Sequence, residues 1–216
     1  TAVIVEEGEN KGISAFVIDA DTEGLSLSSP EKKMGWCASD TRSVFFKDMV
    51  IPKSAILGDP SQGFKQFLKT LAGGRITIGA LGLGTAQGAF LKALDYSQER
   101  EAFGSAINKF QGVSFKLADM ATQIEAARHL VYHAAWKKDQ NLVFAKEASM
   151  AKLFSSETAM NVTTEAIQVL GGFGYIKEYD VERFFRDAKI LEIGEGTSEV
   201  QRMIISRELI KSVQNI

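Results

Sequence analysis

The sequence contains little cysteine, proline and histidine, with one, three and two of these residues among 216. A lone cysteine, Cys37, cannot form an internal disulfide or a cysteine-based zinc site. A reducing compartment is therefore expected, which is the cytoplasm, or the mitochondrial matrix if the source is a eukaryote.

Long apolar runs are absent as well. The longest stretch without a charged residue, between Arg75 and Lys92, has 16 residues, four of them glycine. A membrane-spanning helix needs roughly 20 apolar residues, so no membrane segment is predicted. The N-terminal TAVIVEEGENKG lacks the basic start and apolar centre of a signal peptide and opens on an extended run. We expect the chain to begin inside a structural element.

An excess of one charge sign is missing too. The chain has 25 basic and 27 acidic residues, for a net charge of −2, and its 45% hydrophobic content is that of an ordinary globular protein. The densest basic groups are pairs, such as Lys32-Lys33 and Lys137-Lys138. Because nucleic acids and anionic membrane surfaces are bound by clustered cations, neither is expected as a partner.

The periodicity of apolar residues divides the chain in two. The first sixty residues contain short extended runs, AVIV, ISAFVID, LSLS and SVFFKDMVIP, separated by turn formers. From about Ser61 the period becomes helical. Four strands are few for an independent domain. We therefore predict an α+β chain, with a partial β-domain over 1–60 and an up-down four-helix bundle over 61–216.

Helices are expected over 75–99, 108–136, 141–170 and 198–212. Each of the first three carries an apolar or small-residue stripe at spacings of three and four, which predicts a buried face. The stripes are Ile76, Ala80, Leu83, Phe90 and Leu94; Val113, Leu117, Met120, Ile124, Ala127, Val131 and Ala134; and Ala148, Ala151, Ser155, Ala159, Val162, Ala166 and Val169.

Two motifs have ordinary structural explanations. His129 and His133 share a helix face, but no third ligand accompanies them, so surface or interface histidines are expected and no metal site is predicted. The string LGLGTAQG superficially suggests a dinucleotide loop, yet it lies inside a helical pattern rather than after a strand. The spacing by four of Ala80, Gly84 and Gly88 instead favours close packing between helices.

The segment GEGTSEVQR, residues 194–202, is a candidate site. Glu195 stands between two glycines, so its carboxylate can project into a cavity and its own N–H can be approached. Ser198 and Gln201 have the spacing of a capping box, which predicts a helix beginning just after Thr197. The N–H groups of that helix end suit a phosphate or an oxyanion. A solvated loop glutamate would give the same string, so both interpretations stay open.

Three further segments could bind an anion. Arg75 follows two glycines and precedes an apolar helix, and Arg100 precedes EAFG at another helix end. The string QVLGG, residues 168–172, offers bare backbone to a flat or phosphorylated ligand. Each also fits a helix-end salt bridge or a helix-terminating glycine.

Several strings, in collinear order, make the chain similar to the acyl-CoA dehydrogenase family of flavoenzymes. They are KMGWCASDTRSVFF, IPKSAILGDPSQGF, LAGGRITIGALGLGTAQGA, REAFG with KFQ, QVLGGFGY, VERFFRDAKI and IGEGTSEVQR. The resemblance covers the end of the family's middle β-domain and its whole C-terminal helical domain. The family's N-terminal helical domain and its main flavin-binding strands have no counterpart in this sequence.

The resemblance implies a role for each site residue. Glu195 corresponds to the base that removes the α-proton of an acyl-CoA thioester while a β-hydride passes to the flavin N5, in an apolar slot that this chain only half encloses. Arg75 and Gly196 correspond to positions on the substrate side. Six residues correspond to positions that, in the family, contact the FAD of a neighbouring subunit: Arg100, Phe103, Gln111, Gln168, Gly171 and Gly172. Positions touching the FAD of the same subunit correspond to Thr197 and Glu199.

The resemblance also implies a homo-oligomer, a dimer or tetramer, whose FAD is re-oxidised by an electron-transfer flavoprotein. Departures from the family pattern fall at Ala72, Gly74, Gly194, Ala102 and Phe110. Gly74 stands where some branches keep their catalytic glutamate, and Gly194 stands where short- and medium-chain members often have tyrosine. The substrate's chain length is therefore left open.

The resulting hypothesis is an FAD-dependent acyl-CoA dehydrogenase, present as a fragment that is inactive alone and binds FAD poorly. Two alternatives stay open. One is an acyl-CoA oxidase or another CoA-ester flavoenzyme on the same fold, and the other is a non-catalytic oligomerisation module.

Overall fold

The computed structural model describes residues 1–214. The chain forms two compact units, Thr1–Leu71 and the residues from Ala72 onward. The boundary between them falls within the first helix, α1 (Gly63–Glu99).

The first unit contains two small antiparallel sheets. In one, β1 (Ala2–Glu6) pairs with β2 (Glu9–Phe16), whose end pairs with β5 (Ile56–Leu57); in the other, β3 (Leu25–Leu27) pairs with β4 (Val44–Phe46). The four predicted strands are therefore present. The fourth is shorter than SVFFKDMVIP, and β5 was not predicted.

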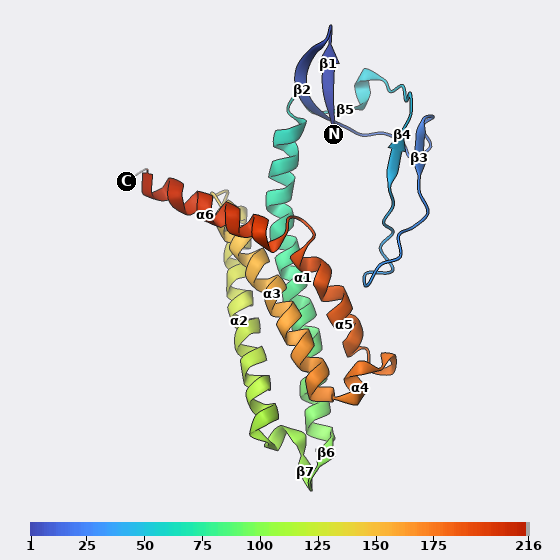
Figure 1. Cartoon of the computed structure of the whole chain (residues 1–216). Helices are drawn as coiled ribbons and strands as arrows, with labels where there is room; N and C mark the ends of the chain where they lie inside the picture. The colour runs from blue at the N-terminus through green and yellow to red at the C-terminus, as the bar shows by residue number, and fades with distance from the viewer. Residues whose placement is uncertain (215–216) are drawn as a thin grey trace. The chain divides into compact units, whose positions relative to one another are not determined.

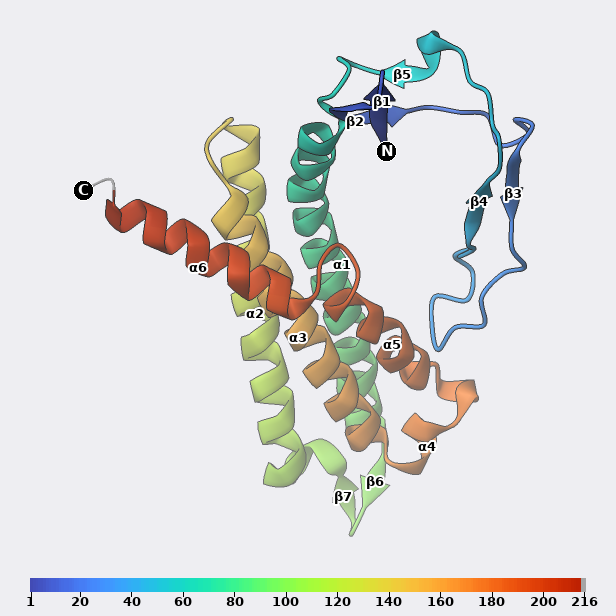
Figure 2. The same ribbon diagram turned by 45° about the horizontal axis from the view of Figure 1, so that its top comes forward.

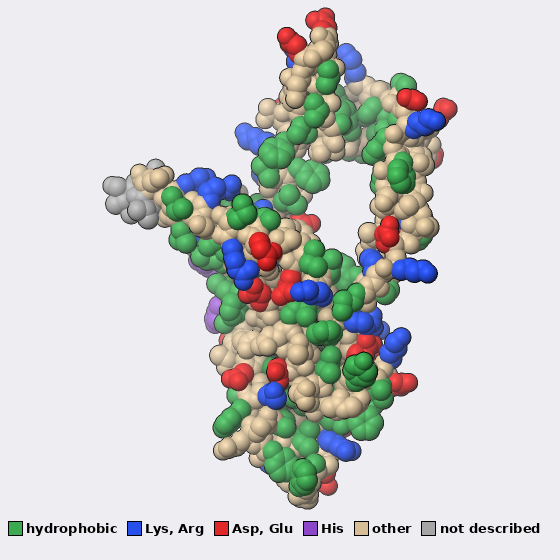
Figure 3. Space-filling model, in the orientation of Figure 1, with side chains coloured by type: hydrophobic (Ala, Val, Ile, Leu, Met, Phe, Trp, Pro, Cys, Tyr) green, Lys and Arg blue, Asp and Glu red, His purple; other side chains and the backbone are tan. Residues whose placement is uncertain are grey.

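The first unit buries little. Within it only Ser14, Ala15 and Gly63 are buried, and α1 begins where Gly63 packs against the backbone of β2: a Cβ on this glycine would lie 2.3 Å from the Ala15 nitrogen. Apolar side chains remain on its surface, as Figure 3 shows, among them Val3, Val5, Val17, Val44, Phe45, Phe46, Phe64 and Phe67. An apolar surface of this kind is typical of a face that another layer covers.

The second unit is helical. Three long helices, α1, α2 (Gln111–Asp139) and α3 (Ala145–Leu170), lie side by side and alternate in direction (Figures 1 and 2). The hairpin β6 (Glu101–Ala102) and β7 (Ser105–Ala106) joins α1 to α2. The remaining helices are α4 (Gly172–Tyr175), α5 (Val181–Ala188) and α6 (Ser198–Gln214). The α+β class with a helical bundle is thus confirmed, although α6 crosses α3 instead of running along it.

Four single turns of 3-10 helix complete the described elements. They cover Lys53–Ala55, Ile107–Lys109, Lys177–Tyr179 and Lys189–Glu192. The segment VERFFRDAKI, residues 181–190, forms α5 and the start of the last of these turns.

The predicted stripes of α2 and α3 form the core. Every member of the α3 stripe is buried, and so is every member of the α2 stripe except the half-buried Val113. Alanine and serine dominate the α3 face, so neighbouring helix axes can approach closely. The central contact cluster consists of Ile76, Val131, Ala134, Ala148 and Ala151.

The close approach of α1 to α3 depends on two glycines. A Cβ on Gly79 would lie 3.3 Å from the Ala151 carbonyl carbon, and one on Gly82 would lie 2.9 Å from the Ser155 carbonyl oxygen. The backbone of α3 therefore fills the space that side chains would need at these positions.

The glycine prediction was partly wrong. Gly88 does pack closely, since a Cβ there would lie 2.8 Å from the Phe184 ring, but Ala80 and Gly84 are exposed, and a Cβ on Gly84 would meet nothing within 4 Å. A spacing of four drifts by about 40° per step on a helix of 3.6 residues per turn. The spacing alone therefore does not identify which glycines face the partner helix.

We expect Gly82→Ala to destabilise the protein by about 1 to 3 kcal/mol, because the added methyl group must push α1 away from the rigid α3 backbone. The matched control is Gly84→Ala, which adds the same group at an exposed helical position and should stabilise the protein by about 0.5 to 1 kcal/mol. Urea unfolding midpoints measure both effects. Equal midpoints for the two variants would contradict this account of the helix contact.

Candidate functional site

The GEG segment forms a left-handed turn directly before α6. Glu195 has φ 55° and Gly196 has φ 95°, so two consecutive residues adopt a conformation that favours glycine. A Cβ on Gly196 would also lie 2.8 Å from the Gln201 side-chain nitrogen. The backbone N–H groups of Glu195 and Gly196 donate no hydrogen bond to any group in residues 1–214. Both remain available to a ligand.

The helix start was predicted correctly, but its cap was not. α6 begins at Ser198, and the Thr197 hydroxyl accepts a hydrogen bond from the Val200 N–H at 3.4 Å. The Ser198 hydroxyl is buried without a partner in the described chain. Gln201 turns back instead, and its Nε2 donates to the carbonyl oxygens of Gly196 at 2.9 Å and Glu195 at 3.3 Å. The predicted capping box is therefore wrong.

A lysine that no sequence motif indicated also holds this turn. Lys152 on α3 is fully buried, and its Nζ donates to the Gly196 carbonyl oxygen at 2.8 Å. Burial lowers the pKa of Lys152, against the opposing effect of the Glu192 and Glu199 carboxylates. The sequence feature that could have identified Lys152 is its position directly beside the small-residue stripe of α3.

The Glu195 carboxylate reaches α1 beside Arg75. A Cβ on Gly74 would lie 2.8 Å from Glu195 Oε2, so the absence of a side chain at Gly74 makes room for the carboxylate. Arg75 is 9% exposed, and its Nε is buried without a hydrogen-bond partner in residues 1–214. Burial lowers the pKa of Arg75, as does the nearby Arg207, while Glu195 acts in the opposite direction.

The Glu195 side chain is itself exposed in the described chain. The backbone of α1 at Gly74 forms one wall beside it. Residues 1–214 do not surround the carboxylate with an apolar cavity on all sides. A fully desolvated site at this position therefore needs further groups.

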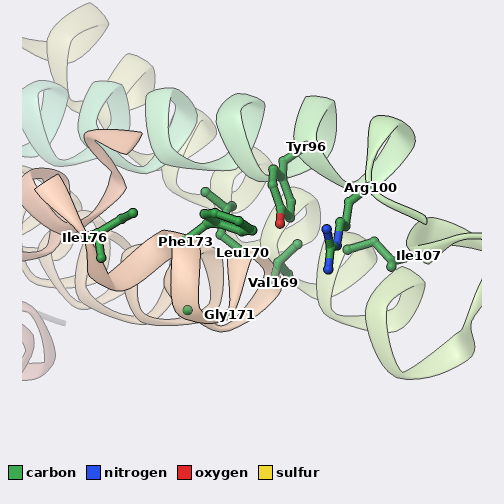
Figure 4. A pocket seen from close by; sticks show the side chains of 9 residues that line it. Tyr96, Arg100, Ile107, Val169, Leu170, Gly171, Phe173 and Ile176 are labelled. Carbon is green, nitrogen blue, oxygen red and sulfur yellow. The ribbon is translucent and has the colours of Figure 1, made fainter. Parts of the chain in front are cut away.

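Arg100 lies far from Glu195 and Arg75. It follows the last residue of α1, about 37 Å from Arg75 along the helix axis at 1.5 Å per residue. A cavity of about 480 Å³ lies there, between the end of α1 and the segment after α3 (Figure 4). Its lining comprises Tyr96, Arg100, Ile107, Val169, Leu170, Gly171, Gly172, Phe173 and Ile176.

The lining of this cavity combines aromatic rings with backbone that carries no side chain. The Arg100 guanidinium carbon lies 5.8 Å from the centre of the Phe173 ring, and that ring lies 6.3 Å from the ring of Tyr96. Gly171 ends α3 with φ 60°, and Cβ atoms on Gly171 and Gly172 would meet nothing within 4 Å. Arg100 has no carboxylate partner in the described chain. A flat, anionic ligand suits this combination of groups.

The remaining predicted residues lie at three positions. Phe103, at the tip of the β6–β7 hairpin, is 99% exposed, and its ring meets that of Phe110 edge-on at 6.2 Å. Gln111 is exposed at the start of α2. Gln168 is exposed on α3 and lines a second cavity, of about 660 Å³, rather than the one beside Arg100.

The structure therefore places the predicted residues in separate groups. Glu195, Gly196, Thr197 and Glu199 lie together at the start of α6, with Arg75 beside them. Arg100, Gly171 and Gly172 share the cavity at the far end of α1.

Other kinds of site are not formed by the described residues. In that part of the chain no three histidine, cysteine, aspartate or glutamate side chains are grouped to hold a metal ion. His129 Nε2 lies 3.4 Å from Glu125 Oε1, and the His133 ring stacks on the Trp136 ring with 6.0 Å between the ring centres. Nor is any described helix both long and apolar enough to span a bilayer.

Comparison with known proteins agrees with the order of the motifs. Residues 61–210 match the family model described as acyl-CoA dehydrogenase, C-terminal domain. The probable acyl-CoA dehydrogenase YngJ of Bacillus subtilis is 52% identical over 212 residues, which is 98% of this chain and 56% of that protein.

Two solved structures are similar as well. Butyryl-CoA dehydrogenase from Megasphaera elsdenii has a TM-score of 0.92 and 46% identity, over 97% of this chain and 55% of that one. A chain in a structure of the electron transferring flavoprotein of Acidaminococcus fermentans has a TM-score of 0.89 and 48% identity, over 91% of this chain and 52% of that one. This chain thus spans about half the length of the proteins that it matches. With the family model matching most of its residues, the chain belongs to the acyl-CoA dehydrogenase family.

Proposed function

We propose that this chain carries the catalytic base and part of the flavin site of an FAD-dependent acyl-CoA dehydrogenase. Such an enzyme forms a double bond between the α and β carbons of an acyl-CoA thioester. The observation that carries the proposal is the position of Glu195, whose carboxylate is directed onto α1 beside the buried Arg75 by a left-handed turn. The similarity to butyryl-CoA dehydrogenase supports a short acyl chain as the substrate.

Glu195 has the two groups that the reaction requires. Its carboxylate would take the α-proton of the substrate as the double bond forms. Its backbone N–H, which has no partner in residues 1–214, would donate to the thioester carbonyl oxygen and stabilise the charge that develops there. The unpartnered Nε of Arg75 offers a further donor on the substrate side.

The residues around Arg100 fit the anionic part of FAD. The guanidinium suits a pyrophosphate, the rings of Tyr96 and Phe173 suit a flat heterocycle, and the open backbone at Gly171 and Gly172 permits close approach. When bound, FAD supplies the acceptor for the β-hydride. Arg100 lies about 37 Å along α1 from Arg75, which stands beside Glu195. This separation supports a homo-oligomer, a dimer or tetramer, in which the cavity serves the cofactor of another subunit.

We infer that the chain does not turn over by itself. It spans about half of its relatives, its first unit exposes apolar side chains, and Glu195 is exposed in the described residues. The missing walls of the site would come from the remainder of the enzyme, and an electron-transfer flavoprotein would re-oxidise the reduced cofactor.

Replacing Glu195 tests the proposed base. In the flavin-loaded enzyme, Glu195→Gln should lower kcat by about 10²- to 10⁴-fold, because the amide cannot accept the α-proton. Bleaching of the flavin absorbance by butyryl-CoA under anaerobic conditions measures the rate. Bleaching at the wild-type rate would remove Glu195 from the mechanism.

Moving the carboxylate to α1 tests the geometry of the site. A side chain at Gly74 would enter the space that Glu195 Oε2 now occupies, so the double variant Glu195→Gly with Gly74→Glu should be at least about 10-fold faster than Glu195→Gly alone. Gly73→Glu in the same background is the matched control. A Cβ at that position points toward Lys138 Nζ, at 3.4 Å, and should restore nothing. Equal rescue from both positions would contradict the geometry.

Arg100 should contribute to FAD affinity. We expect Arg100→Met to weaken FAD binding by about 10- to 100-fold, which corresponds to one lost charge-assisted hydrogen bond. Arg100→Lys should lie between this variant and the wild type, since it keeps the charge but not the planar fork. Titration of the apoenzyme with FAD measures the affinity, and Lys92→Met, elsewhere on α1, is the control. Unchanged affinity in Arg100→Met would exclude the proposed contact.

A further inference from the structure

Lys152 stands out among the buried residues of the second unit. Its side chain is fully buried on α3, although lysine is rarely buried without a charged partner. No carboxylate lies within ion-pair distance of its Nζ in the described chain. Its Nζ donates instead to a backbone oxygen, the carbonyl of Gly196, at 2.8 Å.

That carbonyl oxygen is held from two helices at once. Lys152 approaches it from α3, and the fully buried Gln201 approaches it from α6 at 2.9 Å. A hydrogen bond from an ammonium group to a carbonyl is stronger than one between neutral partners. The peptide unit that follows Gly196 is therefore fixed in orientation, immediately after the two residues with positive φ.

The fixed turn determines where Glu195 points. A non-glycine residue with φ 55° is strained, and such a conformation persists only where the surroundings hold it. If the Gly196 carbonyl turned away, φ at Glu195 could relax toward negative values. The carboxylate would then leave Gly74, and the Glu195 N–H would change direction.

We propose that Lys152 is a positioning residue for the base: by holding the Gly196 carbonyl, it keeps the Glu195–Gly196 turn in the conformation that aims both the carboxylate and the N–H of Glu195. This inference rests on the proposed function. In this role Lys152 contacts neither substrate nor cofactor. The neighbouring charges of Glu192, Glu199 and Glu157 favour its ammonium form, while burial and Arg75 oppose it.

The test uses Lys152→Met in the flavin-loaded enzyme, because methionine fills a similar volume without donating a hydrogen bond. We expect kcat to fall by about 10- to 100-fold from misplacement of the base, with KM changed by less than about two-fold. Backbone amide exchange over residues 195–197 should become faster at the same time. A purely space-filling role for Lys152 would leave both kcat and the local exchange unchanged, and would overturn the proposal.

Two further variants sharpen the result. Lys152→Gln, which keeps a donor of shorter reach, should recover part of the loss, and it also serves if Lys152→Met does not fold. Lys146→Met removes a lysine of the same helix that does not touch the turn, and should match the wild type in kcat and exchange. If both variants fold and the kcat of Lys152→Gln is no higher than that of Lys152→Met, the proposal is also contradicted.

A double-mutant cycle with Gln201→Leu tests whether the two donors act through one carbonyl. We expect the combined loss in kcat to differ from the product of the single losses, since both variants disturb the same oxygen. Independent, multiplying effects on kcat would contradict the shared target.

The Glu195→Gln enzyme separates the role of Glu195 as the base from the positioning role of Lys152. If Glu195→Gln is inactive while Lys152→Met has normal kcat and normal amide exchange, only the positioning role fails.

Discussion

The candidate active site depends on one strained backbone turn. Glu195 and Gly196 both have positive φ, and a glutamate does not hold that conformation without support. The support comes from a buried lysine on α3 and a buried glutamine on α6, which share the Gly196 carbonyl oxygen. The Glu195 side chain is thereby given a defined direction by the orientation of a single peptide group.

The helical bundle supplies the rigidity that this arrangement requires. The small residues along α3 allow α1 to approach at Gly79 and Gly82 until backbone meets backbone. Well-packed interiors of this kind resist small displacements. Gly74 on α1, beside the Glu195 carboxylate, and Lys152 on α3, at the Gly196 carbonyl, are consequently held at fixed positions, although they lie far apart in the sequence.

The two candidate sites use opposite parts of the same scaffold. At the start of α6 the protein offers a carboxylate, free backbone N–H groups and a buried guanidinium. At the far end of α1 it offers aromatic faces, a solvent-accessible guanidinium and two glycines. The first set suits proton transfer beside a carbonyl, and the second suits binding of a large anionic ligand. The two sets lie at well-separated positions along α1.

The sequence by itself determined the buried faces of α2 and α3, because burial there follows a period of three and four residues that local spacing records directly. The stripe predicted on α1 was only partly correct, since Ala80 is exposed and Phe90 and Leu94 are half-buried. The sequence also placed the start of α6, and its motifs identified Glu195, Arg75 and Arg100 as candidate site residues. Only the tertiary structure showed that Gly82 rather than Gly84 meets α3, and that Lys152 and Gln201 hold the turn before α6. These features depend on which atoms of distant segments meet, and the spacing of residues along one segment carries no information about the partner it faces.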